Sequence, residues 1–186
     1  MSDLRPKSPD PVKEVQAYVA YLMAALGDRD PMVVLGETPD RVRQAAAGLT
    51  AVQQATPERA GKWSVRHVAQ HLADSELVGG FRFRMILAHD RPRLPGYDQD
   101  LWANRLHYLE ADLDDALGEF ASLRESNMRL LGRATPSELK RAMHQAERGD
   151  ETLAQMIPMY AGHDLVHLKQ IERIRRAIGA PGQDAP

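Results

Sequence analysis

The chain has 186 residues, of which 43% are hydrophobic and 27% charged, and its formal net charge is −2. This length fits one domain with a real core, and the near-neutral charge argues against nucleic acid as a partner. Because the sequence contains no cysteine, disulfides, thiolate nucleophiles and cysteine-based zinc sites are excluded.

The two ends of the chain differ in composition from the rest. Residues 1–10 are rich in proline and charge, and residues 180–186 read APGQDAP. We expect both ends to be loosely ordered around a single domain that spans residues 1–186. The first residues lack the apolar segment of a secretion signal, and no apolar run has membrane-spanning length. These features favour a cytoplasmic protein that does not enter the membrane.

The N-terminal part of the chain begins with one long helical pattern. Apolar residues recur at helical spacing over residues 11–26, which predicts the first of four long helices. Residues 30–50 contain Pro31, Gly36 and Pro39. We expect these helix-breaking residues to divide that stretch into short helical pieces.

The other three long helices are delimited by capping signals. One is expected over residues 64–90, with Ser64 as its N-cap, and the next over residues 112–132. The last covers residues 152–178 and begins with a capping box. Pro158 lies inside it, so we expect a kink or a missing backbone hydrogen bond there.

The connections between these helices carry shorter signals. TPSE at residues 135–138 has the form of a capping box and predicts a short helix, whereas residues 144–151 are expected to form a loop. A proline-containing loop with Asp98 leads to a further short helix that contains Trp102. The pattern as a whole predicts an all-α bundle with short extra helices in its connections.

Two histidines, His163 and His167, stand four residues apart in the apolar stripe of the last helix. Two buried imidazoles side by side need partners, because an unpaired buried polar group is costly. One metal ion between them meets that need, since residues four apart on a helix can reach a single ion. The alternative is a pair of core histidines that hydrogen-bond to Asp164 or Tyr160.

A third ligand would favour the metal over this alternative, and His71 is the best candidate. It flanks the apolar stripe of the second long helix, where a neighbouring helix could meet it. His67, one turn earlier, is the rival; it falls in the first turn of the helix, further from the centre of the stripe, and the alternative is that it stays exposed. The remaining three histidines lie at helix ends or in loops and are interpreted as surface residues: His89, His107 and His144.

The stretches WSVRHVAQHLADSELVGGFRFRMILAHDRPRLPGYDQDLW and MYAGHDLVHLKQIERIR resemble the DinB superfamily, also known as the DinB/YfiT-like metalloenzymes. The resemblance implies a four-helix bundle in which three histidines hold a divalent metal, often zinc or nickel. The family's histidine in H-L-A-D matches His71, and its H-x-x-x-H pair matches His163 and His167. It also implies a homodimer, and its best-understood relatives are transferases and isomerases that use low-molecular-weight thiols.

Three neutral imidazoles would leave at least one coordination position open, which is the catalytic pattern for zinc. Such an ion lowers the pKa of a bound water or thiol. The expected activity is therefore that of a metal-dependent hydrolase or a thiol S-transferase acting on a small molecule. The alternative is a non-catalytic metal-binding or stress-response bundle in which the metal is structural. The sequence has no H-E-x-x-H motif and no E-x-x-H motif, so neither a zincin nor a ferritin-type di-iron site is expected.

Five further residues are candidates for the surroundings of the metal. Tyr160, Gln170 and Asp74 could hold imidazole N–H groups or a bound water. Arg82 lies on the same helix face as His71; it could bind an anionic substrate group, but an ordinary ion pair is the favoured interpretation. Trp102 could close the pocket or belong to the core.

Overall fold

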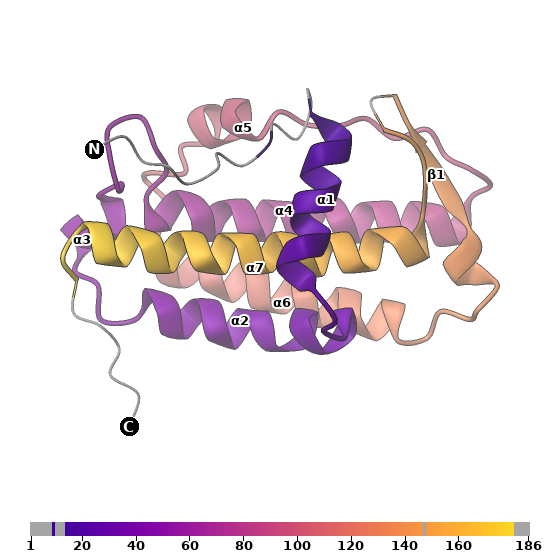
Figure 1. Cartoon of the computed structure of the whole chain (residues 1–186), viewed down its shortest axis with the longest axis horizontal. Coiled ribbons are helices and arrows are strands. Elements are labelled where there is room, and N and C mark those ends of the chain that lie inside the picture. Colours follow the sequence, from indigo (N-terminus) through magenta and orange to yellow (C-terminus); the bar gives the residue numbers. More distant parts are fainter. Residues whose placement is uncertain (1–8, 10–13, 147, 181–186) are drawn as a thin grey trace.

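Four helices run alongside one another and enclose the interior of the protein (Figure 1). The structure, a computed structural model, describes residue 9, residues 14–146 and residues 148–180. The predicted loose ends therefore lie almost entirely outside the described residues. Helices α2 and α4 do not face each other directly; each packs against both α6 and α7. The four bundle helices are α2 (Pro31–Ala46), α4 (Val65–Ala88), α6 (Leu113–Leu131) and α7 (Leu153–Ala177).

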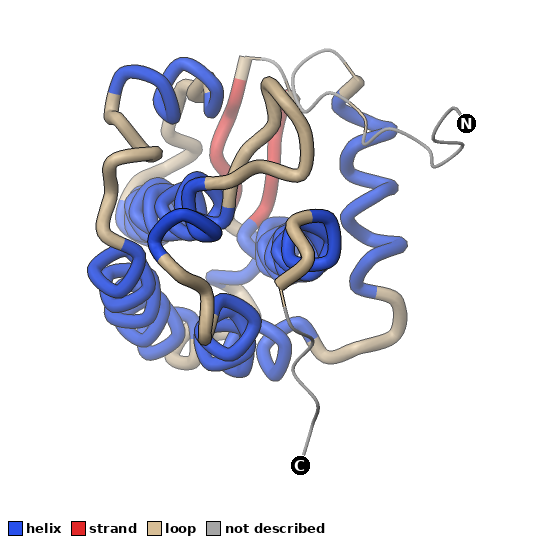
Figure 2. Tube along the Cα trace, turned by 90° about the vertical axis from the view of Figure 1, so that its left-hand side faces the viewer, coloured by secondary structure: helices blue, strands red, loops and turns tan. Residues whose placement is uncertain are grey.

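Helix α1 (Val15–Leu26) lies outside this bundle and crosses α7 steeply (Figure 2). Gly162 makes the close crossing possible, because a Cβ at this position would lie 2.3 Å from the backbone oxygen of Leu22. The first predicted helix is thus a covering element, and the fourth helix of the bundle comes from the stretch that was predicted to be broken.

The prediction of short helical pieces over residues 30–50 is wrong, because α2 continues through both Gly36 and Pro39. Proline has no N–H, so the carbonyl of Leu35, four residues earlier, has no partner within the helix. The guanidinium of Arg124 on α6 donates to that carbonyl over 2.7 Å. A tertiary contact therefore satisfies the group that would otherwise end the helix.

The three later helices agree with their predicted bounds to within about two residues. Asp112 caps α6 through its side chain, and Thr152 forms a capping box with Gln155 at the start of α7. Helix α7 continues through Pro158 without a break. The carbonyl left without a donor belongs to Ala154, which is exposed and can bond to water.

The connections hold short elements. The predicted capping box between Thr135 and Glu138 is present, and a single turn of 3₁₀ helix follows it. The loop expected over residues 144–151 is instead an antiparallel hairpin with Gly149 at a φ of 77°. The short elements are α3 (Ala51–Ala55), α5 (Gln99–Arg105), η1 (Glu138–Lys140), β1 (Ala142–Gln145) and β2 (Gly149–Thr152).

Two apolar clusters fill the two halves of the bundle. One contains Leu72 and Leu168, and the other contains Phe83 and Leu165. On both α4 and α7, buried polar residues lie near the boundary between the two clusters, so a buried polar layer crosses the middle of the molecule. Its members include Thr38, His71, Glu76, Arg124, Asn127, Asp164 and His167. Among the described residues, no helix has the length and apolar character that crossing a bilayer requires.

Candidate metal centre

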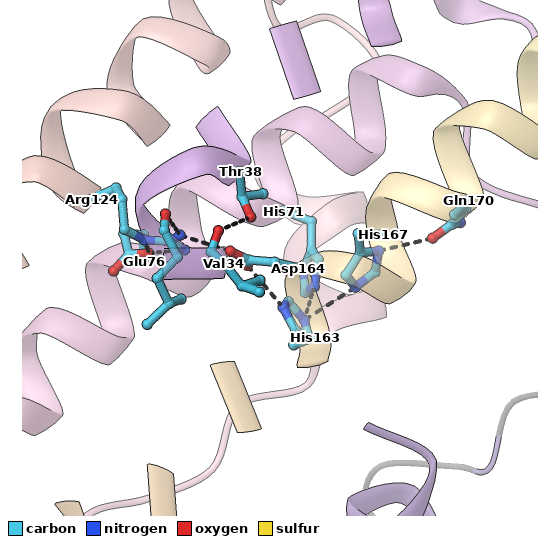
Figure 3. A network of polar contacts seen from close by, with 10 residues as sticks. Val34, Thr38, His71, Glu76, Arg124, His163, Asp164, His167 and Gln170 are labelled. Carbon is cyan, nitrogen blue, oxygen red and sulfur yellow. Dashed lines mark hydrogen bonds and ion pairs between the residues drawn. The ribbon is translucent and has the colours of Figure 1, made fainter. Parts of the chain in front are cut away.

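Three imidazoles converge at the edge of this polar layer (Figure 3). His71 comes from α4, and His163 and His167 come from successive turns of α7. The Nε2 atom of His163 lies 3.0 Å from Nε2 of His71 and 3.1 Å from Nε2 of His167. One ligand atom from each residue falls within 4.8 Å of the others. The structure therefore brings together all three predicted ligands, although they are separated by up to 96 positions in the sequence (167 − 71).

These spacings fit a first-row divalent ion. Zinc binds imidazole nitrogen at about 2.0–2.1 Å, so two nitrogens of a tetrahedral site lie about 3.3 Å apart. The two shortest distances between Nε2 atoms are within a few tenths of an ångström of that value. Three nitrogens that face one another cannot all find hydrogen-bond partners among themselves, because each neutral ring offers only one N–H. A shared cation is the partner that all three would accept.

The protonation state of His167 suits metal binding. Its Nδ1 lies 2.9 Å from Oε1 of Gln170, one turn further along α7. An amide oxygen only accepts hydrogen bonds, so Nδ1 carries the proton and the lone pair of Nε2 points at the other two rings. Burial, together with the neighbouring His163, lowers the pKa of His167 to about 3. The ring is therefore neutral at pH 7.

His71 is in the same electrostatic situation and is almost fully buried. Desolvation lowers its pKa well below the ordinary value, and the two neighbouring imidazoles add to the effect. The Nδ1 atoms of His71 and His163 have no hydrogen-bond partner among the described residues. On its Nδ1 side, the ring of His71 is thus held by packing.

The indole of Trp63 supplies much of that packing. Its centroid lies 4.9 Å from the ring of His71 and 6.3 Å from the ring of His167. The sequence analysis did not identify Trp63 as a neighbour of the histidines. The signal that could have found it is its position just before the N-cap of α4, about two helical turns ahead of His71.

His67 does not belong to the cluster. Its Nδ1 lies 2.9 Å from the hydroxyl of Ser64 and 3.4 Å from the Ser64 backbone nitrogen. The side chain therefore takes the position of the usual acidic or amide residue in a capping box. It is partly exposed, and desolvation lowers its pKa.

The hydrogen-bonded alternative for the histidine pair has one long contact, between Asp164 and His163. Asp164 Oδ1 lies 3.9 Å from His163 Nδ1, which is too long for a hydrogen bond. The other oxygen of Asp164 accepts from Arg124 at 2.7 Å instead. No described hydrogen bond joins Tyr160 to either imidazole. Asp164 therefore faces His163 at ion-pair distance, and Tyr160 holds neither imidazole.

A cavity of about 540 Å³ opens directly beside the histidines. Its wall includes His71 and His163, and other parts of the wall come from α1, the loop before α5 and the β-hairpin. Pockets of about 300–1,000 Å³ accommodate small-molecule ligands. The imidazole cluster therefore has protein on one side and a ligand-sized space on the other.

A sequence profile of the DinB superfamily matches residues 35–171, which include all three histidines. The chain belongs to the DinB superfamily. The match begins within α2 and ends near the C-terminus of α7, so it covers the four bundle helices and leaves α1 outside.

Relatives of this DinB protein carry names that refer to metal-dependent hydrolysis. "Putative metal-dependent hydrolase YfiT" of Bacillus subtilis is 31% identical over 147 residues, which are 78% of this chain and 83% of the relative. A Bacillus licheniformis protein of the same description is 31% identical over 146 residues, 78% of this chain and 83% of its own length. A Bacillus mycoides protein named in the same way is 29% identical over 142 residues, 76% of this chain and 82% of its own length.

A solved structure is also similar over nearly the whole chain. B. subtilis YfiT superimposes with a TM-score of 0.75 at 26% sequence identity, and the alignment covers 95% of this chain and 94% of that one. It is described as a probable metal-dependent hydrolase with an unusual four-helix bundle topology. The likeness supports both the family assignment and the four-helix bundle.

The remaining candidate residues of this DinB chain are divided between the cavity and the scaffold. Tyr160 and Arg82 line the cavity. Asp74 accepts a hydrogen bond from the hydroxyl of Tyr108 and has no described hydrogen bond to an imidazole. Trp102 contacts Tyr97, which lines the cavity; the two rings are tilted by 40° and their centroids lie 4.5 Å apart. Trp102 thus packs against a residue of the cavity wall without lining the cavity itself.

The favoured interpretation of Arg82 as an ion-paired residue is wrong. No described carboxylate lies within ion-pair distance of its guanidinium, which instead donates to the backbone oxygen of Pro95 over 3.0 Å. The sequence could not distinguish these outcomes, because the partner of an arginine depends on which loop folds over it.

Proposed function

We propose that this DinB protein is a metal-dependent hydrolase of small molecules whose metal is held by His71, His163 and His167. The observation that carries the proposal is the convergence of three Nε2 atoms beside a 540 Å³ cavity, whose wall includes His71 and His163. Zinc or nickel suits a set of three imidazoles. Such an ion, when bound, supplies a Lewis acid and lowers the pKa of a coordinated water.

The protein's own residues prepare the site for that ion. Gln170 fixes the proton of His167 on Nδ1, so that Nε2 is available as a ligand. Trp63 and the apolar cluster behind it exclude water from one side of the rings. The opposite side faces the cavity, which leaves room for a substrate next to the ligands. A purely structural metal would be expected in a closed site without such a space.

A test combines metal analysis with hydrolysis of an ester panel by protein purified without a histidine tag. We expect about one metal ion per chain and ester turnover that a chelator abolishes. His163→Ala should lose both metal and turnover while its circular dichroism spectrum remains helical. His89→Ala removes an exposed histidine of the same chain and should change neither. Metal content without turnover on any ester, but with turnover on thiol substrates, would assign thiol S-transfer to the same ligand set.

We also propose that the chain forms a homodimer, as the family resemblance implies. Leu77 and Phe81 lie one turn apart on α4 and are 49% and 54% exposed, so they offer an apolar contact for a second copy. Sedimentation equilibrium should give twice the mass of the chain, and Phe81→Ser should weaken the association. A monomer at all concentrations would contradict the dimer without affecting the metal site.

A further inference from the structure

Arg82 is a buried cation that projects from α4 into the wall of the cavity. Its residue exposure is only 6%, yet no described carboxylate pairs with it. One nitrogen donates to Pro95 O at 3.0 Å, and the guanidinium also lies beside the hydroxyl of Tyr160. A guanidinium has five N–H donors, so these neighbours leave part of it unused.

Arg124, on the neighbouring helix, shows what a buried arginine usually requires. It is 3% exposed and contacts two carboxylates, those of Glu76 and Asp164. A buried charge without an opposite charge is unfavourable by several kcal/mol, on the order of the cost of removing one member of a buried pair. Arg82 is buried without a counter-charge at the wall of a space large enough for a ligand. This indicates that the missing anion belongs to the ligand.

The other charged residues that line the cavity are either paired or exposed. Arg148 is paired with Glu151 at 3.1 Å. Asp98 uses its carboxylate to cap α5, and both Asp98 and Asp100, which also line the cavity, are exposed to solvent. Charges at an exposed rim are screened by salt and water. Among the described residues that line the cavity, Arg82 is the buried cation that remains available.

The position of Arg82 relative to the histidines fits recognition of the far end of a substrate. His71 and Arg82 are 11 positions apart on α4, so they lie on one face within about 20° and are separated by about 16 Å along the helix axis. Arginine side chains on a helix lean toward its N-terminus, here toward His71. A substrate could thus meet the metal ligands at one end and the guanidinium at the other.

We propose that Arg82 binds an oxyanion of the substrate, a carboxylate or a phosphate, while the bond to be hydrolysed lies at the three histidines. This inference rests on the proposed function, whose substrate class it specifies. The planar guanidinium suits either oxyanion, because its paired N–H groups can donate two parallel hydrogen bonds.

The test measures binding of glutarate and of inorganic phosphate by calorimetry, with glutaramide as the uncharged counterpart of glutarate. Full-length protein is used both metal-free and zinc-loaded, because zinc could itself bind an anion. In the metal-free protein we expect glutarate or phosphate to bind and glutaramide to bind at least about tenfold more weakly. The tighter of the two anions identifies the source of the oxyanion.

Three variants make the test specific. Arg82→Met should weaken anion binding by about ten- to a hundredfold. Arg82→Lys should weaken anion binding less, because lysine keeps the positive charge and lacks only the paired N–H groups of the guanidinium. Arg84→Met removes the same charge from an exposed position on the same helix, where Arg84 contacts Asn127, and should bind like the wild type. Thermal melts confirm that each variant is folded.

The outcomes separate the two proposals. Equal binding of glutarate and glutaramide, no anion binding, or unchanged binding by folded Arg82→Met would overturn the role of Arg82. Stoichiometric zinc in that same variant would then leave the proposed metal centre intact. Arg82-dependent anion binding in a protein that takes up no metal would contradict the proposed function and leave the anion site standing.

Discussion

Gln170 shows how one residue outside the metal ligands controls the site. Its amide oxygen holds the proton of His167 on Nδ1 at a distance of 2.9 Å. Gln170→Leu should lower zinc affinity by about ten- to a hundredfold, because His167 loses its preferred tautomer and orientation. Competition with a fluorescent chelator measures the affinity. Lys169→Leu, at an exposed neighbouring position, is the matched control, and equal affinities in the two variants would contradict this role.

At the scale of residues, helical periodicity was sufficient to identify the metal-ligand candidates. His163 and His167 share the apolar stripe of α7, and His71 flanks the stripe of α4, so burial and convergence could be expected from the sequence. The unpaired state of Arg82 could not be expected, because it depends on which loop from elsewhere in the chain lies against α4.

Among the elements, the contact between α1 and α7 depends on a glycine. A helix interior normally favours alanine over glycine by about 0.5–1 kcal/mol. At Gly162, however, a Cβ would lie 2.3 Å from Leu22 O, so Gly162→Ala must displace α1 and should lower the free energy of unfolding by about 1–3 kcal/mol. Urea denaturation provides the measurement.

Gly118 on α6 is the matched control for this substitution. A Cβ there would meet nothing within 4 Å. Gly118→Ala should therefore raise the free energy of unfolding by about 0.5–1 kcal/mol. If both alanine variants were stabilised to the same extent, α1 would not pack on α7 as described.

The elements that the sequence did not predict are those in which tertiary contacts override local preference. Pro39 would end an isolated helix, but Arg124 satisfies the carbonyl of Leu35 and α2 continues. The hairpin over residues 142–152 has strands of only four residues, too short for an alternating pattern to be recognised. The capped helices α6 and α7 were predictable because their signals are local.

In the molecule as a whole, the polar layer between the two apolar clusters joins helices that are far apart in sequence. Arg124 contacts Glu76 on α4 and Asp164 on α7 (Figure 3). It also donates to the backbone oxygen of Leu35 on α2. Because Asp164 is adjacent to His163 in the chain, this ion-pair network anchors the turn of α7 that carries the first histidine of the pair.

Arg124→Met should reduce the free energy of unfolding by about 3–5 kcal/mol, because it leaves two buried carboxylates without a counter-charge. Arg129→Met removes an exposed arginine from the same helix, where it pairs with Glu125, and should cost less than about 1 kcal/mol. Urea unfolding curves of the two variants give the comparison. Similar small losses would show that the buried network does not hold the bundle together.

The convergence of the three imidazoles on one cation is tested most directly by anomalous scattering at the zinc absorption edge from crystals of the zinc-loaded protein. We predict one strong peak about 2.0–2.1 Å from Nε2 of His71, His163 and His167, on the side that faces the cavity. A peak bound to other residues, or no peak among these rings at saturating zinc, would contradict the assignment of this site as a metal centre.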